Sequence, residues 1–240
     1  MLFRSYSQFG DVPTMLNLSP RRTLADLVTA SEDMDIQVVE EHLETHSSGL
    51  KVAIGSVLPQ PLDLFTTRFL EQLTGILKRQ YRFIVVDVPP ILHAGTLYML
   101  AHSQTVLLVA NLFDLTTASD TKKLLDAIKG SYVPPERLRV VLNRVSRENQ
   151  LQVPDLEKAF GQSVIAQLPN DGKIVPTSVN GGVPFVVSQP GSLVAQSVRN
   201  LATSLTMSAL TPHAPPEEAI GRMPLGIRNL RSFLANCFTS

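Results

Sequence analysis

The fold is decided by the stretch RFIVVDVPP at residues 82–90. Its apolar residues run without interruption from residue 83 to residue 86, and Asp87 follows them. A short, continuous apolar run is typical of a strand that is covered on both faces. Pro89 and Pro90 lack backbone donors and therefore end the strand. The stretch predicts a buried strand with a carboxylate at its end.

Four other short apolar runs alternate with amphipathic segments along the chain. Five strands are predicted, at residues 50–54, 83–86, 105–109, 138–142 and 164–168. Three helices are predicted, at residues 62–79, 119–129 and 193–207, because their apolar residues recur at helical spacing. Strands that alternate with helices favour right-handed crossovers between parallel strands. We therefore predict an α/β fold, with a mainly parallel sheet flanked by helices on both faces.

The composition narrows the class of protein. The chain has 240 residues, with 21 Lys and Arg against 21 Asp and Glu, so its formal net charge is zero. This balance of charge does not favour binding to a polyanion, and we expect no nucleic-acid partner. Its only cysteine, Cys237, excludes an internal disulfide and fits a reducing compartment. No apolar run approaches the roughly 18 residues that span a bilayer. We expect a cytoplasmic protein.

Polar residues follow three of the predicted strands. Asp87, Asn143 and the pair Pro169–Asn170 each stand at or just beyond a carboxyl end, which is where parallel sheets bind ligands. A carboxylate there can hold Mg²⁺ through water beside a bound nucleotide. An asparagine amide can pair with a purine, and a loop can flank the base. The plainer alternative is that all of them are ordinary turn-forming residues.

Two histidines have the spacing of a metal-binding pair. His42 and His46 are four residues apart, a spacing that can place two metal ligands on one helix face. However, the glutamates around them suit a solvated acidic helix, and no cysteine lies nearby. We therefore do not predict a metal site at this pair.

Five motifs occur in an order and spacing that can be compared with known families. They are QFGDV at residues 8–12, TLADL at 23–27, VVDVPP at 85–90, VLNRV at 141–145 and LPND at 168–171. This series resembles the ParA/MinD-like ATPases, and it is most similar to the CpaE/TadZ branch, which is associated with pilus assembly and polar localisation in bacteria. The resemblance covers about residues 8–206.

The resemblance implies a set of roles. Asp87 would be the Walker B aspartate that is linked to Mg²⁺, Asn143 would read adenine, and Pro169 and Asn170 would flank the other side of the base. ATP and Mg²⁺ would be the cofactors of the complete protein. A homodimer with pilus or secretion assembly proteins as partners would act in the cytoplasm, peripheral to the inner membrane or at a cell pole.

The chain also departs from this family. Members carry a glycine-rich phosphate loop and a switch aspartate, whereas this chain has Tyr6 near the expected position of the aspartate. Its only Gly-Lys pair, at residues 172–173, is followed by Ile174 in place of Ser or Thr. We therefore expect an N-terminally truncated ATPase that does not hydrolyse ATP as given, with unpaired strand edges and exposed apolar surface. The alternative is a scaffold that works through protein contacts without nucleotide.

Composition and resemblance together predict four segments. Residues 1–7 lack family character, residues 8–207 form the ATPase-type domain, residues 208–222 are a proline-rich linker, and residues 223–240 are an amphipathic tail. Within the tail, residues 225–238 place apolar side chains at helical spacing beside arginines. Such a segment suits an anionic membrane surface or the groove of a partner protein. The alternative is that it packs on its own domain.

Overall fold

The structure of the protein is a computed structural model that describes residues 1–4, 11–30, 34–58, 60–61, 63–111, 115–146 and 151–210. Contacts divide the chain into two compact units, Met1–Ala202 and Thr203–Ser240. The strands of the described residues lie in the first unit. The predicted tail and all but the first three residues of the predicted linker lie outside the described residues, and the four predicted segments stay predictions.

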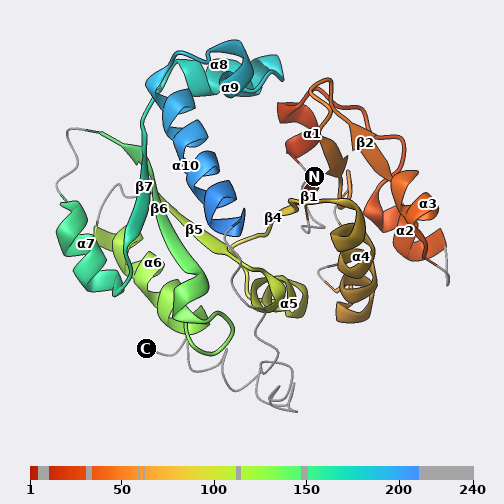
Figure 1. The fold of residues 1–240 in the computed structure, drawn as a ribbon, viewed down its shortest axis with the longest axis horizontal. Coiled ribbons are helices and arrows are strands. Elements are labelled where there is room, and N and C mark those ends of the chain that lie inside the picture. Colours follow the sequence, from red (N-terminus) through yellow and green to blue (C-terminus); the bar gives the residue numbers. More distant parts are fainter. Residues whose placement is uncertain are drawn as a thin grey trace. The chain divides into compact units, whose positions relative to one another are not determined.

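Helices and strands alternate along most of the chain, and most of the crossovers are helical (Figure 1). The strands are β1 (Leu2–Arg4), β2 (Leu43–Thr45), β3 (Lys51–Ala53), β4 (Val85–Asp87), β5 (Val106–Asn111), β6 (Leu138–Val145) and β7 (Val164–Pro169). The helices are α1 (Val12–Met15), α2 (Leu24–Ala30), α3 (Ile36–Glu40), α4 (Thr67–Gln80), α5 (Ala94–His102), α6 (Leu115–Ile128), α7 (Val153–Phe160), α8 (Ile174–Gly181), α9 (Phe185–Ser188) and α10 (Leu193–Leu210), with a short 3-10 turn at Pro135–Arg137.

The strands form two sheets. The first sheet has the order β2-β3-β1-β4, in which β1 runs parallel to both β3 and β4 and only β2 is antiparallel. The second sheet has the order β5-β6-β7 and is wholly parallel. The predicted α/β fold with mainly parallel strands is confirmed. A single continuous sheet is not observed among the described residues, because β4 and β5 do not pair with each other or with a common neighbour.

Strand β1 is the main surprise of the first sheet. The sequence pattern predicted no strand in residues 1–7, yet Leu2 pairs in register with Val52 on one side and with Val85 on the other. The ladder continues where the backbone N–H of Val85 donates to the Met1 carbonyl oxygen at 2.9 Å. A strand of three residues is too short to show a hydrophobic period, so pairing on both edges, rather than its own pattern, identifies it.

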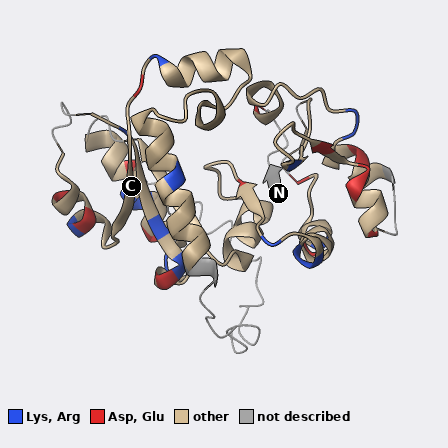
Figure 2. Ribbon diagram, turned by 45° about the horizontal axis from the view of Figure 1, so that its top comes forward, with Lys and Arg blue, Asp and Glu red and all other residues tan. Residues whose placement is uncertain are grey.

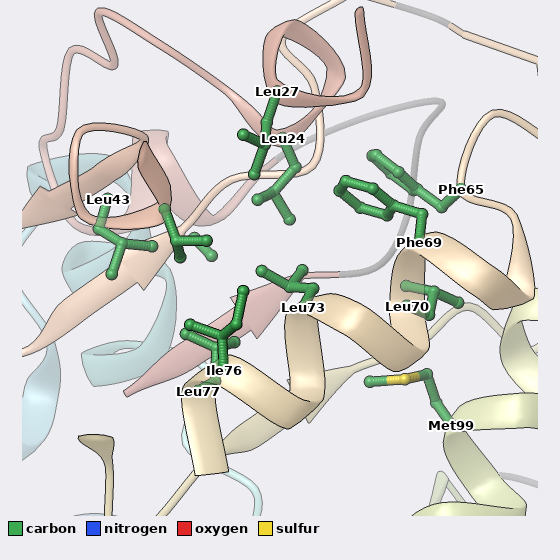
Figure 3. Packing of buried hydrophobic residues seen from close by; sticks show 12 residues of the cluster. Leu24, Leu27, Leu43, Phe65, Phe69, Leu70, Leu73, Ile76, Leu77 and Met99 are labelled. Atoms are coloured by element: carbon green, nitrogen blue, oxygen red, sulfur yellow. The ribbon is translucent and has the colours of Figure 1, made fainter. Parts of the chain in front are cut away.

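Helix α4 carries the first hydrophobic core. The sequence pattern placed its start at residue 62, but the helix begins at Thr67 because the Thr66 hydroxyl accepts a hydrogen bond from the Phe69 N–H at 3.2 Å. Leu70, Leu73 and Leu77 are fully buried along one stripe of this helix (Figure 3). Burial of each such side chain stabilises the fold by about 1.5–3 kcal/mol.

The TLADL motif starts α2 with a reciprocal cap. The N–H and the hydroxyl of Thr23 donate to Asp26 Oδ2 at 2.7 and 2.8 Å, and the Asp26 N–H faces the Thr23 hydroxyl at 3.4 Å. These hydrogen bonds to Thr23 lower the pKa of Asp26 below its ordinary value. The two leucines of the motif, Leu24 and Leu27, are fully buried in the first core (Figure 3). The motif therefore has a structural role in this chain.

A second hydrophobic core covers one face of the β5-β6-β7 sheet, and α5 joins the two cores. Side chains of β6, α6 and α7 form most of the second core, with Leu138 and Phe160 almost fully buried. In α5, Met99 belongs to the first core and the next residue, Leu100, belongs to the second. Val88, just after β4, contacts both. The segment between β4 and β5 therefore connects the two sheets through side-chain packing.

His93 fixes the start of α5. Its Nδ1 accepts a hydrogen bond from the Gly95 N–H at 3.2 Å, so the ring must be neutral at that nitrogen. Gly95 is buried beneath the ring, and a Cβ at this position would lie 3.0 Å from His93 Cε1. Burial lowers the pKa of His93 below its ordinary value.

Truncation of Leu73 tests the first core. Replacing Leu73→Ala leaves a cavity where the side chain is fully buried, and we expect a loss of about 2–5 kcal/mol in the free energy of unfolding. Gln72→Ala, on the exposed face of the same helix, should change it by less than about 0.5 kcal/mol. Urea unfolding followed by circular dichroism measures both. Equal losses in the two variants would contradict the assignment of the core.

Protonation of His93 should destabilise the fold. Because its pKa is lower in the folded chain than in the unfolded chain, the unfolded chain binds the proton more readily. Stability from this residue is therefore complete above the unfolded pKa of about 6.5 and is lost as the pH falls below it.

The matched variant His93→Asn keeps an acceptor at the cap and removes the titration. Between about pH 7.5 and pH 5.5, the wild type should lose more of its free energy of unfolding than this variant does. Urea midpoints at the two pH values measure the difference. Parallel losses would show that His93 does not carry the effect.

Candidate functional site

The carboxyl ends of β5, β6 and β7 bring several polar residues to one edge. In the ladder between β5 and β6, Asn111 is the register partner of Asn143. In the ladder between β6 and β7, Val145 is the register partner of Pro169. Parallel pairing therefore places Asn143 and the loop that begins at Pro169 at the same edge of the sheet, which is where ligands of such sheets bind.

The backbone around Asn143 has an unusual conformation. Asn143 is partly buried, and its Oδ1 accepts a hydrogen bond from the Arg144 N–H at 3.0 Å. Arg144 has a φ of 57°, in the left-handed region that residues other than glycine rarely adopt. Rare backbone conformations concentrate at binding and catalytic sites, although they do not by themselves identify one.

Hydrogen bonds fix the loop after β7. The Asn170 N–H donates to the Val145 carbonyl oxygen at 2.8 Å, which holds the loop against the end of β6. Asp171 Oδ1 accepts from the N–H groups of Lys173 at 3.1 Å and Ile174 at 2.7 Å, which fixes the turn just before α8. Asn170 itself is exposed. The loop thus presents an asparagine to solvent from a fixed backbone.

Asp87 stands in the other sheet. It is the last residue of β4 and is exposed, and its register partner is Arg4 of β1. Two residues later Pro89 is buried, so the chain turns inward directly after the carboxylate. The structure therefore brings Asn143, Pro169 and Asn170 together, whereas no backbone pairing joins Asp87 to them.

Asn111 lies at the same edge of the sheet, and the sequence pattern missed it. The predicted strand stopped at residue 109, but β5 continues through Ala110 and Asn111. Ala110 is buried and its weak apolar character hid the extension. A signal was present in the sequence, because Asn111 follows the apolar run of β5 just as Asn143 follows the apolar run of β6.

The residues present fit Mg²⁺ and a nucleotide base in part. Among the described residues no group of three or more His, Cys, Asp and Glu is placed to hold a metal ion. Mg²⁺ bound beside a nucleotide usually takes one or two carboxylates, with phosphates and water as its other ligands, and a single exposed Asp87 fits that pattern. The described residues contain no glycine-rich turn of the kind that cradles phosphates.

The histidine pair does not lie on a helix. The expectation of a shared helix face is wrong because α3 ends at Glu40, before either histidine, and β2 separates the two. His42 is buried, and its Nδ1 donates to the Val38 carbonyl oxygen at 2.8 Å. His46 Nδ1 interacts with the Ser48 hydroxyl at 2.8 Å. Both rings are engaged in local hydrogen bonds.

Charge and hydropathy add two observations. Lys and Arg residues are scattered over several elements of the described chain rather than gathered on one face (Figure 2). Among the described residues, no helix combines the length and the apolar character that crossing a bilayer requires.

No protein-family model matches the chain, but individual proteins do. It is 24% identical over 144 residues to a putative septum site-determining protein MinD from Mesostigma viride, covering 58% of this chain and 50% of that protein. It is also 24% identical over 148 residues to the septum site-determining protein MinD of Synechocystis, covering 60% and 54%. The chain thus spans about half the length of the curated relatives it matches.

Solved structures share the fold. A ParA family ATPase from Chlorobium tepidum superposes with a TM-score of 0.74 at 20% identity, covering 84% of each chain. MinD from Pyrococcus horikoshii, complexed with Mg-ADP, superposes with a TM-score of 0.73 at 20% identity, covering 87% of this chain and 83% of that chain. The chain is therefore related in sequence to MinD proteins, and its fold is that of the ParA/MinD ATPases.

Proposed function

We propose that this chain belongs to a ParA/MinD-like ATPase of the CpaE/TadZ type, which acts as a nucleotide-dependent dimerisation switch in pilus assembly or polar localisation. The observation that carries the proposal is the shared edge at which β6 and β7 hold Asn143, Pro169 and Asn170. The sequence relationship to MinD proteins and the shared fold support it.

Each proposed residue has a role that its position allows. Asn143, partly buried at the end of β6, pairs with the edge of adenine, and Pro169 and Asn170 flank the other side of the base. Asp87 holds Mg²⁺ through water, and the ion neutralises the charge of the phosphates. A MinD relative of the same fold is complexed with Mg-ADP, which supports ATP and Mg²⁺ as the cofactors.

Dimerisation is the proposed output of the site. In a homodimer that holds nucleotide between its subunits, ATP stabilises the assembly by mass action, and hydrolysis releases it. The MinD of Aquifex aeolicus has been solved in a MinC:MinD complex, which supports protein partners for the fold. We propose pilus or secretion assembly proteins as the partners, and residues 225–238 as the contact with a membrane surface or a partner groove. The protein then works in the cytoplasm, at the inner membrane or at a cell pole.

A nucleotide-free scaffold is the second candidate. It is favoured by one observation, which is that the sequence contains neither a glycine-rich phosphate loop nor, near Tyr6, the switch aspartate of the family. Without amides and lysines around the phosphates, a nucleotide loses its main source of binding energy. In this case the fold acts through its contacts with other proteins.

Nucleotide binding separates the two candidates. The given chain is compared with the same chain extended by a ParA/MinD strand, phosphate loop and helix, using a fluorescent ATP analogue and Mg²⁺. We expect binding by the extended chain only. Asp87→Ala should weaken it by about tenfold and remove its dependence on Mg²⁺. Asn143→Ala should weaken the affinity for ATP by about tenfold and reduce the preference for ATP over GTP.

Matched controls keep the outcome specific. Asp155→Ala and Asn180→Ala remove the same side-chain types from exposed positions on α7 and α8, and should leave the affinity unchanged. If the extended chain folds and binds no nucleotide, the ATPase proposal fails and the scaffold stands.

A further inference from the structure

Helices α1 and α8 connect the two sheets at a place where no strands pair. In the sequence α1 follows β1 of the first sheet and α8 follows β7 of the second sheet, and the two helices pack against each other (Figure 1). The first sheet carries Asp87 at the end of β4, and the loop between β7 and α8 carries Asn170. The α1–α8 contact therefore joins the two parts of the protein over which the candidate site is divided.

The contact is made by the ends of the two helices. Helix α1 ends at Met15, and Asn17, two residues later, has a φ of 49°. Helix α8 ends at Gly181, and its C-cap, Gly182, has a φ of 62°. A left-handed residue commonly ends a helix, and glycine adopts this conformation without strain. Both helices therefore end in a left-handed turn where they meet.

Gly182 has no room for a side chain. It is buried, and a Cβ at this position would lie 2.9 Å from Asn17 Cβ, 3.2 Å from the Thr14 carbonyl oxygen and 3.3 Å from the Asn17 amide nitrogen. Two of these three neighbours are backbone atoms, which cannot rotate away as the end of a flexible side chain can. A side chain at residue 182 would therefore have to separate α1 from α8.

Helix α1 is anchored to the first sheet. Val12 is buried with Val52 and Ile54 in a small third core. Val52 lies in β3 and is the register partner of Leu2 in β1. The position of α1 is thus tied to the ladder that also contains β4. Because the third core has only three buried residues, α1 should open more readily than the rest of the described chain.

Helix α8 is anchored to the loop after β7. At its C-terminal end, the Ser178 hydroxyl donates to the Val183 carbonyl oxygen at 2.7 Å, and the Val183 N–H donates to the Ser178 carbonyl oxygen at 3.3 Å. These bonds close the chain around Gly182. At its other end, α8 follows the loop in which the Asn170 N–H donates to the Val145 carbonyl oxygen at 2.8 Å. Packed elements thus form a continuous path from Asn170 to the first sheet.

We propose that α1, α8 and the Asn170 loop open and close as one cooperative unit, which sets the position of this loop relative to the sheet that carries Asp87. A ligand that contacts both Asp87 and Asn170 favours the closed unit, and by linkage the closed unit raises the affinity for that ligand. This role in ligand binding rests on the proposed function. The cooperative unit itself rests on the contacts alone.

Hydrogen exchange of the full chain in low urea tests the unit without a nucleotide. The reporter amides are those of Leu18, whose N–H donates to the Pro13 carbonyl oxygen at 2.8 Å, Val183 and Asn170. Amides that are exposed by one opening event share the same free energy of opening and the same dependence on urea. We expect the three reporters to coincide, and the amides of β6 to need a larger free energy of opening.

Gly182→Ala should open the unit. We expect exchange at the three reporters to rise by the same factor, about tenfold or more, because the new Cβ meets α1 and alanine is strained at a positive φ. Gly181→Ala is the matched control, since a Cβ there meets no atom within 4 Å, and it should leave exchange unchanged. Gly130→Ala imposes similar backbone strain, at a φ of 77° in open space, and should raise exchange near residue 130 only.

Asn17→Gly provides a rescue across the contact. It removes the Cβ that residue 182 would meet at 2.9 Å, and glycine tolerates the positive φ of this position. Added to Gly182→Ala, it should lower exchange at Asn170 several-fold, although the strain at residue 182 remains. The two single variants complete a double-mutant cycle that measures the interaction. A purely local role of the contact would not change exchange at Asn170.

Three results would overturn the proposal. Different free energies of opening at Leu18 and Asn170 in the wild type would show that α1 and the loop open separately. A rise confined to α8 in Gly182→Ala would show that the contact is local packing. An equal rise at β6 would show that the variant destabilises the whole fold. Failure of the extended chain to bind ATP, with this exchange pattern intact, would remove the role in nucleotide binding and leave the cooperative unit in place.

Discussion

A strand inside a parallel sheet needs a neighbour at each edge and a cover on each face, and most features of this chain depend on how far that requirement is met. Strand β6 meets it in full, with β5 and β7 at its edges and Val140 and Val141 completely buried. Strand β1 has neighbours at both edges although it is only three residues long. Among the residues that the structure describes, β4 pairs only with β1 and β5 pairs only with β6. The described strands therefore form two ladders that no strand pairing connects.

Side-chain packing, rather than backbone pairing, joins the two ladders. Helix α5 lies between β4 and β5 in sequence and places adjacent residues, Met99 and Leu100, in different cores. Its cap, His93, follows the loop that begins after Asp87. The ladder between β1 and β4 positions the candidate carboxylate Asp87, whereas the ladder between β6 and β7 positions Asn143 and Asn170. Side-chain packing through α5 connects these two ladders.

The sequence predicts the parts of this fold that bury one stripe or one continuous run. The strands near residues 138–142 and 164–168 and the helix of residues 67–80 follow from their apolar pattern, and so does the alternation that gives the α/β class. Helix α5 was not predicted, because it contacts two cores and is apolar on several sides and therefore has no amphipathic period. Strand β1 was not predicted either, because its pairing on both edges defines it and three residues are too few to show a strand pattern.

The sequence likewise predicts some residues of the candidate site and misses others. Asn143, Pro169 and Asn170 are predicted by their position after strands, and the register of β6 with β7 accounts for their proximity. Asn111 was missed because the buried Ala110 ends the strongly apolar run, while the backbone continues in register with β6. No pattern within single strands reveals that β4 and β5 are edges, since that property belongs to the order of the strands in the sheets.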